Sequence, residues 1–505
     1  MADSDPGRRG PAISRRVSRW TAIVVVAAVA STVVSAAVFL QRGAAAWRAA
    51  GTAPGVVITS GYEEESHFAL WRALHGQPVY TDPSRMPFAS AYFNWLFYSG
   101  YALPLRPLVS AAGDAAIVRD GRLITAAGAL AGAWILFITL RRILRHAAFA
   151  AAVAAFVFFG PLVGWWAHTV RPDVWALACE TAGTAAILFW HRERPRLALV
   201  LSLALFFAAC SFKQTFIACL ASTVLFLAAR SQWRLAAALA LGWVALCGAA
   251  LLVLGPAYRA AQFDTALTSV FSIDWGLRIS RGALVKILPL LVLAIGVLLQ
   301  PSAGAAAPDS LADDARLFGW IGAAVAGAIA LAASFKTGAS VNYFFTFALM
   351  LALAGCASLA GRPAPRLQVL VCAIAIAFQG LALTGWAGRV DLDGPLRTAA
   401  LRWETFRRLP EPRFTSDYSL ELPWLNADSP PLVLAYNYDI ARRSGRRFEG
   451  GGVAGLIESG YFASLFLPAD TQDSFFGGSL RNYERGATVD GLTVYRRSSR
   501  ASPRS

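Results

Sequence analysis

The feature that most constrains this 505-residue chain is a series of long apolar runs separated by short polar turns. A helix needs roughly 17 to 25 mostly apolar residues to cross about 30 Å of hydrocarbon. Composition agrees, since 56% of the residues are hydrophobic, 15% are charged and the mean hydropathy is +0.50. We therefore expect an α-helical polytopic membrane protein with about 11 transmembrane helices. The spans begin near Trp20, Arg122, Ala147, Val174, Leu197, Thr215, Leu235, Ile287, Leu317, Tyr343 and Leu367.

The basic residues indicate the direction in which the chain crosses the membrane. If the segment 1–19 is cytoplasmic, most arginines fall on the inner side, as the positive-inside rule requires. Three short outer turns then receive one cation each, Arg171, Lys213 and Lys336. The net charge of +16 is thus an orientation signal, and we expect no nucleic-acid partner. The inner set is Arg8, Arg9, Arg15, Arg16, Arg19, Arg141, Arg142, Arg145, Arg192, Arg194, Arg196, Arg230, Arg234, Arg316, Arg362 and Arg366.

Three regions outside the spans lie on the outer side in this topology. The outer loop 41–119 contains "SHFALWRALHGQPVY" and "MPFASAYFNWLFYSGYALPL", which we expect to form helices at the membrane interface. The second loop, 256–285, has mixed polarity. Beyond the transmembrane region 20–387, the tail 388–505 has the composition of a soluble domain. Its "PLVLAYN", "ASLFLPA" and "GLTVYRR" predict strands and "VAGLIESGYF" predicts a helix, so we expect a small α/β domain.

The unusual polar residues gather at this outer side. "GYEEESH" lies in the first outer loop, "HTVRPD" opens the fourth span, "SFKQTF" joins spans five and six, and "SFKTGASVNYFF" joins spans nine and ten. The positive-inside rule disfavours basic residues in short outer turns. The single cation at each of these turns therefore suggests that it binds a ligand on the outer side. An anionic lipid-linked substrate such as a polyprenyl-phosphate sugar fits. Arg and Lys would bind its phosphate, and a carboxylate would act as general base or bind a divalent cation.

The arrangement resembles the GT-C superfamily of membrane glycosyltransferases, in particular the bacterial glycosyltransferase family 39 group, which is related to protein O-mannosyltransferases and lipid A aminoarabinose transferases. The residues that carry the resemblance are "GYEEESHFALWRALHGQPVYTDPSRMPFA", "RPDVWAL", "KTGASVNYFF" and the terminal "DGLTVYRR". The likeness covers most of the chain. The resemblance implies a multi-pass protein of the bacterial inner membrane with a periplasmic tail. It would transfer a sugar to a lipid, glycan or protein acceptor.

The same resemblance assigns roles to individual residues. The acidic pair that acts in this family as catalytic base and metal contact corresponds to Glu63 and Glu64, with Mg²⁺ or Mn²⁺ as the candidate ion. Arg171, Lys213 and Lys336 would bind the donor phosphate. This chain has Glu where the family more often has Asp, so the choice between the two glutamates stays open. Candidates for supporting roles are Glu65, His67, Arg85, Asp173, Gln214, Asn342 and Tyr343.

Each feature also has a purely structural interpretation. A glutamate triplet often marks a solvated helix start, Asp173 can simply pair with Arg171, and the two lysines can anchor helix ends. His67, His75 and His168 lack zinc-ligand spacing, and the six cysteines lie in apolar runs as packing residues. No phosphate loop, dinucleotide turn or nucleophile elbow is present in the sequence. The competing functional classes are a lipid or glycan flippase and a non-catalytic membrane protein with a sensory tail.

Overall fold

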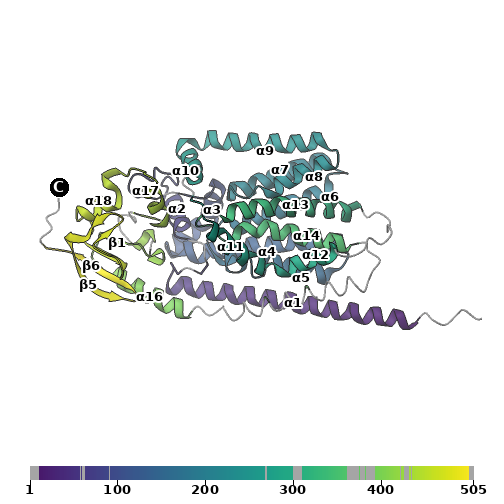
Figure 1. Ribbon diagram of the computed structural model, residues 1–505, viewed down its shortest axis with the longest axis horizontal. Helices are drawn as coiled ribbons and strands as arrows, with labels where there is room; N and C mark the ends of the chain where they lie inside the picture. Colours follow the sequence, from purple (N-terminus) through teal and green to yellow (C-terminus); the bar gives the residue numbers. More distant parts are fainter. Residues whose placement is uncertain are drawn as a thin grey trace, which may run out of the picture.

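The computed structural model describes residues 11–499 except 57, 60–62, 90, 268–269, 299–309, 361–374, 376–381, 383–392, 421, 426–431 and 434. Long helices run roughly side by side and form one elongated bundle, with the longest, α1 (Pro11–Thr52), along one edge (Figure 1). A small sheet-containing domain caps one end of this bundle. The chain is therefore a mostly helical protein with a small C-terminal sheet domain.

Most predicted spans correspond to helices. They are α1, α4 (Ala116–Leu144), α5 (Ala147–Phe159), α6 (Asp173–Trp190), α7 (Pro195–Phe212), α8 (Ala218–Ala229), α9 (Trp233–Val253), α12 (Leu288–Leu298), α13 (Ser310–Ser334) and α14 (Phe345–Leu359). Within the described residues six helices are long and apolar enough to cross a membrane, and a seventh span is possible if α11 (Ile273–Lys286) and α12, bent by 70°, act together. The predicted number of 11 is therefore not confirmed, and the span near Leu367 lies outside the described residues.

Small residues let the helices of the bundle pack closely. A Cβ atom on Gly319 of α13 would lie 2.6 Å from the backbone nitrogen of Ala354 in α14, so only glycine permits this approach. Gly183 of α6 likewise accommodates the ring of Phe206 in α7. Without a hydrophobic force between helices in lipid, such close contacts supply the attraction. They fix α6, α7 and α14, whose ends nearest the C-terminal domain build the site described below.

The loops predicted to lie outside contain helices at the end of the bundle that faces the C-terminal domain. The first loop forms α2 (Glu64–Leu74) and α3 (Trp95–Ala112), as predicted, and the second forms α10 (Gly255–Leu267) and α11. The side chain of Asn94 caps α3 by accepting from the amide of Trp95, and it also donates to the carbonyl of Cys210 at 2.8 Å. This contact attaches the first outer loop to the end of α7.

The C-terminal domain is built on a four-stranded sheet in the order β1-β2-β6-β5. Its strands are β1 (Arg413–Thr415), β2 (Ser464–Pro468), β5 (Tyr483–Val489) and β6 (Leu492–Arg497); β1 and β2 are parallel and the other pairs antiparallel. The helices are α16 (Asp393–Arg407), α17 (Ala435–Arg443) and α18 (Gly452–Glu458), and β3 (Ser474–Phe475) and β4 (Gly478–Ser479) form a separate hairpin. The strands in "ASLFLPA" and "GLTVYRR" and the helix in "VAGLIESGYF" are confirmed.

The predicted strand in "PLVLAYN" is wrong for the described residues of this segment, where Leu432 makes an isolated bridge and α17 begins at Ala435. The partner of that bridge is Phe88 of the first outer loop. The Phe88 ring packs with Tyr438 and Phe448 at centroid distances of 5.8 and 5.7 Å and belongs to the core of the C-terminal domain. An apolar side chain from the helical part thus completes the core of the tail domain and fixes the position of that domain over the bundle.

The buried position of Phe88 predicts that its ring stabilises the docking of the C-terminal domain on the helix bundle. Phe88→Ala should weaken the docking of the C-terminal domain by about 3–5 kcal/mol, because it removes a buried ring and leaves a cavity. Limited proteolysis of the full-length protein in detergent should then release the tail domain faster. Met86→Ala is the control, since Met86 is half exposed and two residues away. Equal protease resistance of Phe88→Ala and wild type would contradict the prediction.

Candidate active site

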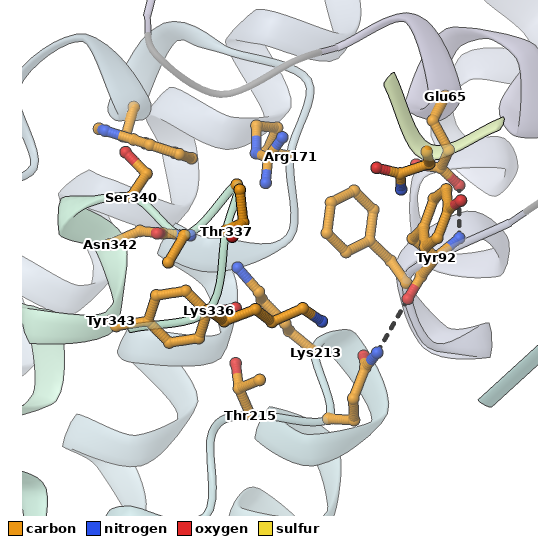
Figure 2. A pocket seen from close by; sticks show the side chains of 16 residues that line it. Glu65, Tyr92, Arg171, Lys213, Thr215, Lys336, Thr337, Ser340, Asn342 and Tyr343 are labelled. Carbon is orange, nitrogen blue, oxygen red and sulfur yellow. Dashed lines mark hydrogen bonds between the residues drawn. The ribbon is translucent and has the colours of Figure 1, made fainter. Parts of the chain in front are cut away.

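A pocket of about 190 Å³ lies at the end of the bundle nearest the C-terminal domain, which is the predicted outer end, where loops from four parts of the chain meet. Figure 2 shows Arg171, Lys213 and Lys336 directed into the same space, with Glu65 beside Tyr92 on another side. We call it the outer pocket. Its lining is Glu65, Tyr92, Phe93, Trp166, Arg171, Lys213, Gln214, Thr215, Lys336, Thr337, Gly338, Ala339, Ser340, Asn342, Tyr343 and Asn437. The structure thus brings together the three predicted phosphate-binding cations with Glu65, Gln214, Asn342 and Tyr343.

The buried carboxylate of Asp173 organises one wall of this pocket. Asp173 is the first residue of α6 and is fully buried. Its Oδ1 accepts from Lys213 Nζ at 2.5 Å and from Asn342 Nδ2 at 2.6 Å, and its Oδ2 accepts from Arg171 Nε at 3.3 Å. One carboxylate therefore fixes side chains from three separate loops. It neutralises only one of the two cations that it touches.

The three cations are held in surroundings that favour an anionic ligand. Arg171 lies over the rings of Phe93 and Trp166, with its Cζ 4.9 and 4.8 Å from the ring centroids. Burial, together with the positive charges of Arg171 and Lys336, lowers the pKa of Lys213 to about 8 despite the opposing effect of Asp173. Burial also lowers the pKa of Lys336. A phosphate group would relieve this crowding of positive charge.

Three side-chain oxygens around the pocket add hydrogen-bonding capacity. In the described part of the chain, Gln214 Oε1, Thr337 Oγ1 and Asn342 Oδ1 are buried and have no hydrogen-bond partner. The amide nitrogens of Gln214 and Asn342 are both engaged, by the carbonyl of Tyr92 and by Asp173, so the orientation of these two side chains is fixed. Buried polar atoms without partners are costly, so these oxygens are suited to receive ligand hydroxyl groups.

Glu65 is the only member of the glutamate triplet that lines the outer pocket. Its Oε1 accepts from the amide of Tyr92 at 2.9 Å and from the hydroxyl of Tyr98, and Ser66 Oγ lies 3.5 Å from its Oε2. Burial raises the pKa of Glu65 to about 7, although these donors and the charge of Arg171 act in the opposite direction. The carboxyl group can therefore exchange a proton near neutral pH, which a general base requires.

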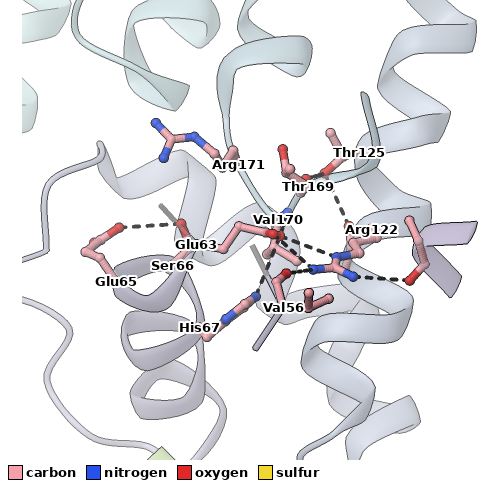
Figure 3. A network of polar contacts seen from close by, with 12 residues as sticks. Val56, Glu63, Glu65, Ser66, His67, Arg122, Thr125, Thr169, Val170 and Arg171 are labelled. Carbon is pink, nitrogen blue, oxygen red and sulfur yellow. Dashed lines mark hydrogen bonds and ion pairs between the residues drawn. The ribbon is translucent and has the colours of Figure 1, made fainter. Parts of the chain in front are cut away.

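Glu63 points to the other side of α2 and forms a buried ion pair (Figure 3). Its Oε2 lies 3.0 Å from a guanidinium nitrogen of Arg122, and its Oε1 accepts from the amide of Val170 at 2.6 Å. Burial alone would raise the pKa of Glu63, but Arg122, His67 and the Val170 amide bring it below its usual value. Arg122 also donates to the carbonyls of Ala46 and Val56. Glu63 thus joins the first outer loop to α1, α4 and the loop before α6.

The remaining predicted residues lie away from the pocket lining. Glu64 and His67 are buried in α2, and burial lowers the pKa of His67 to about 4, so its ring is neutral at pH 7. Arg85 is exposed and lies 3.9 Å from Asp82. His75 packs against Trp71, and His168 packs against Phe39. The structure therefore brings neither Arg85 nor these histidines to the cations.

The surroundings of Glu63 and Glu64 bear on their predicted role as metal ligands. Glu63 already binds Arg122, and Glu64 lies on the same helix without a third ligand. Among the residues that the structure describes, no group of three or more His, Cys, Asp or Glu side chains is arranged to hold a metal ion. Glu63 is committed to Arg122 in this arrangement. The Mg²⁺ or Mn²⁺ contact stays a prediction, and no step below passes through a metal.

Several residues of the site were missed by the sequence reasoning. Arg122, the partner of Glu63, follows Arg119 and Asp120 at the predicted start of a span, so the sequence does not single it out as a site residue. Asn437 reaches the pocket from α17 of the C-terminal domain, and nothing in the sequence indicates this contact. Glu180 lies deep in α6, where its carboxylate accepts from the amide of Cys219 at 3.1 Å and from the Thr346 hydroxyl at 2.5 Å. It thereby joins α6 to α8 and α14.

Comparison with known proteins gives the fold. No family model and no curated sequence matches the chain. Two crystal structures of ArnT from Cupriavidus metallidurans are similar to it, each at 14% sequence identity. The structure bound to undecaprenyl phosphate has a TM-score of 0.57, and the match covers 93% of this chain and 99% of that chain. The apo structure has a TM-score of 0.52, and the match covers 96% of this chain and 98% of that chain. The chain therefore has the fold of these ArnT structures, in line with the resemblance described above.

The Glu63–Arg122 pair predicts a strong energetic coupling. Breaking a buried pair by removing one charge costs about 3–5 kcal/mol, because the other charge is left buried alone. Glu63→Gln and Arg122→Gln should each lower the thermal unfolding temperature in detergent. The double variant should be destabilised by clearly less than the sum of both single changes. Additive effects would show that the two side chains do not depend on each other.

Proposed function

We propose that this protein transfers a sugar from a polyprenyl-phosphate donor to an acceptor at the outer face of the membrane. The observation that carries the proposal is the outer pocket itself, where three cations face a carboxyl group whose pKa is about 7. A phosphate-binding site beside a proton acceptor is what glycosyl transfer from a lipid phosphate needs. The similarity to an ArnT structure bound to undecaprenyl phosphate supports the lipid carrier.

Arg171, Lys213 and Lys336 are proposed to bind the donor phosphate. Arg171 would keep its hydrogen bond from Nε to Asp173 and direct its guanidinium group toward phosphate oxygens. The two lysines would supply point charges from the loops after α7 and α13. Negative charge grows on the phosphate oxygen as its bond to the anomeric carbon breaks, so cations fixed in advance stabilise the transition state more than the ground state.

Glu65 is the residue that we propose as general base, in place of Glu63 or Glu64. The oxygen of an acceptor hydroxyl, or the nitrogen of an amine, attacks the anomeric carbon. The proton of that group passes to the Glu65 carboxylate, and the polyprenyl phosphate leaves with the electron pair of the broken carbon–oxygen bond. Tyr98 and the Tyr92 amide hold Oε1 of Glu65, so Oε2 is the atom suited to receive the proton.

The acceptor is proposed to reach the pocket from the side of the C-terminal domain. Asn437 of α17 is the pocket residue that this domain contributes. The acceptor would be an envelope lipid, glycan or protein that offers a hydroxyl or amine group. The flippase alternative finds less support, because the cations of the pocket gather at one end of the bundle and do not lie along a path through it.

Glu65 predicts the pH dependence of transfer. Because only the ionised carboxylate accepts a proton, and kcat/KM reports the pKa of the enzyme before the donor binds, kcat/KM of the wild type should rise with pH and level off above about 7. Glu65→Gln should reduce kcat by about 10²–10⁴-fold and abolish this pH dependence. The measurement is transfer of radiolabelled sugar from a polyprenyl-phosphate donor by the purified protein, with an envelope extract as acceptor.

A stability control separates loss of the base from misfolding. The folded-state pKa of Glu65 lies above its ordinary value of 4.5, so its contribution to stability decreases as pH rises from about 4.5 to 7. Glu65→Gln should therefore unfold at a higher temperature than the wild type at pH 8, and this difference should shrink at pH 5. An active Glu65→Gln variant with an unchanged pH profile would exclude Glu65 as base.

The proposed contact of Lys336 with the donor phosphate predicts a loss of donor affinity when the lysine is replaced. Hydrogen bonds to charged groups contribute about 1.5–3 kcal/mol, so Lys336→Gln should weaken binding of polyprenyl phosphate about 10- to 150-fold. Lys286→Gln is the matched control, because Lys286 ends α11 and does not line the pocket. Binding is measured by competition with a fluorescent polyprenyl phosphate in detergent. Equal affinities of the two variants would remove Lys336 from the phosphate site.

A further inference from the structure

A second pocket, with a volume of about 520 Å³, lies at the other end of the bundle. We call it the inner pocket; its lining is His191, Arg192, Pro195, Ser231, Gln232, Trp233, Arg234 and Leu235. It is formed by the turn between α6 and α7 and the turn between α8 and α9. Since α6 begins at the outer pocket with Asp173 and ends at Trp190, its length separates the two pockets. The inner pocket therefore has no part in the transfer chemistry proposed above.

The inner pocket carries an excess of positive charge. Arg192 and Arg234 line it, and no acidic side chain is among its described lining residues. Behind the lining, Asp314 of α13 is shared by Arg192 at 2.7 Å, Arg230 at 2.6 Å and His191 at 3.0 Å. Asp314 thus faces two arginines and a histidine. Asp313 also acts electrostatically on Arg192 and Glu193 lies in the same turn, but Arg192, Arg194, Arg230 and Arg234 outnumber these three carboxylates. This arrangement leaves a net charge that an anion would compensate.

Two helix N-termini point their positive ends toward the same pocket. α7 begins at Pro195 and α9 at Trp233, and both residues belong to the lining. Neither helix receives a side-chain cap from its preceding residue, Arg194 or Gln232. The first amide groups of a helix and its dipole favour negative charge. They therefore add to the attraction that the arginines exert.

Apolar surface continues from this charged pocket along the bundle. Trp233 is 66% exposed at its rim, where an indole ring suits the boundary between headgroups and hydrocarbon. Further along the same two helices, Val200 of α7 is 62% exposed and Leu241 of α9 is 70% exposed. Residues of this kind face lipid chains in a membrane protein. The charged pocket and the apolar helices together match a phosphate headgroup with acyl chains attached.

We propose that the inner pocket binds the headgroup of an anionic phospholipid from the surrounding bilayer. Arg192 and Arg234 contact its phosphate, Trp233 lies at the level of its glycerol, and the acyl chains lie along α7 and α9. The exposed apolar surface favours a lipid over free phosphate, because free phosphate has no apolar chains to contact this surface. Occupancy neutralises the excess charge beside Asp314 and ties the α6–α7 and α8–α9 turns together at the membrane surface.

The test is lipid binding by the full-length protein in detergent. Native mass spectrometry would compare dioleoyl phosphatidylglycerol with dioleoyl phosphatidylcholine, which has no net charge. The wild type should retain the anionic lipid preferentially. Arg192→Gln with Arg234→Gln should lower its affinity about 30-fold, because each basic residue near a membrane surface contributes about 1 kcal/mol. Arg234→Gln alone leaves the contacts of Asp314 intact and should lower the affinity about fivefold.

A charge-matched variant serves as control. Arg141→Gln with Arg316→Gln removes two arginines from the same end of the bundle, at the end of α4 and the start of α13, and neither lines the inner pocket. It should bind phosphatidylglycerol like the wild type. Equal losses in both double variants, or no preference of the wild type for phosphatidylglycerol, would overturn the proposal. Displacement of the lipid by millimolar inorganic phosphate would also overturn it, because the ligand would then be the free anion.

Discussion

The contacts of Asp173 are the interaction on which the outer end of the molecule depends. A fully buried carboxylate at the start of α6 binds Arg171, Lys213 and Asn342, which come from loops far apart in the sequence. Without it, two cations would lie buried side by side with no counter-charge, at a cost of several kcal/mol each. Asp173 therefore makes the cationic pocket possible, yet its single charge leaves the pocket positive.

Two glutamates of the triplet, Glu63 and Glu65, have different surroundings although both lie at the start of α2. Neighbours two residues apart on a helix point roughly 200° apart, so Glu63 and Glu65 must face different surroundings. Glu63 meets Arg122 and becomes a structural ion pair, whereas Glu65 meets the aromatic wall of the pocket and keeps a proton near neutral pH. The ion pair of Glu63 fixes the position of α2 and thereby the direction of Glu65.

Much of the arrangement of helices could be predicted from the sequence, because the length of an apolar run and the positions of arginines can be read within each segment alone. The helices of the first outer loop, most spans and the convergence of Arg171, Lys213 and Lys336 follow from those two signals. The choice among the three glutamates could not be predicted, since it depends on which side of α2 meets Arg122. The docking of Phe88 in the tail domain and the contribution of Asn437 also escaped, because contacts between distant segments leave no periodicity in either segment.

In the proposed transfer reaction, the electrostatic balance of the outer pocket would link binding of the donor to the pKa of the proposed base, Glu65. Arg171 lowers the pKa of Glu65, while burial raises it. A bound phosphate would take over part of the positive charge that Glu65 now experiences, and the pKa of Glu65 would then rise. The carboxylate would become a stronger base at the moment when the donor is in place. When the polyprenyl phosphate leaves, the cations again favour the ionised form, so the proton taken from the acceptor is released more readily to solvent.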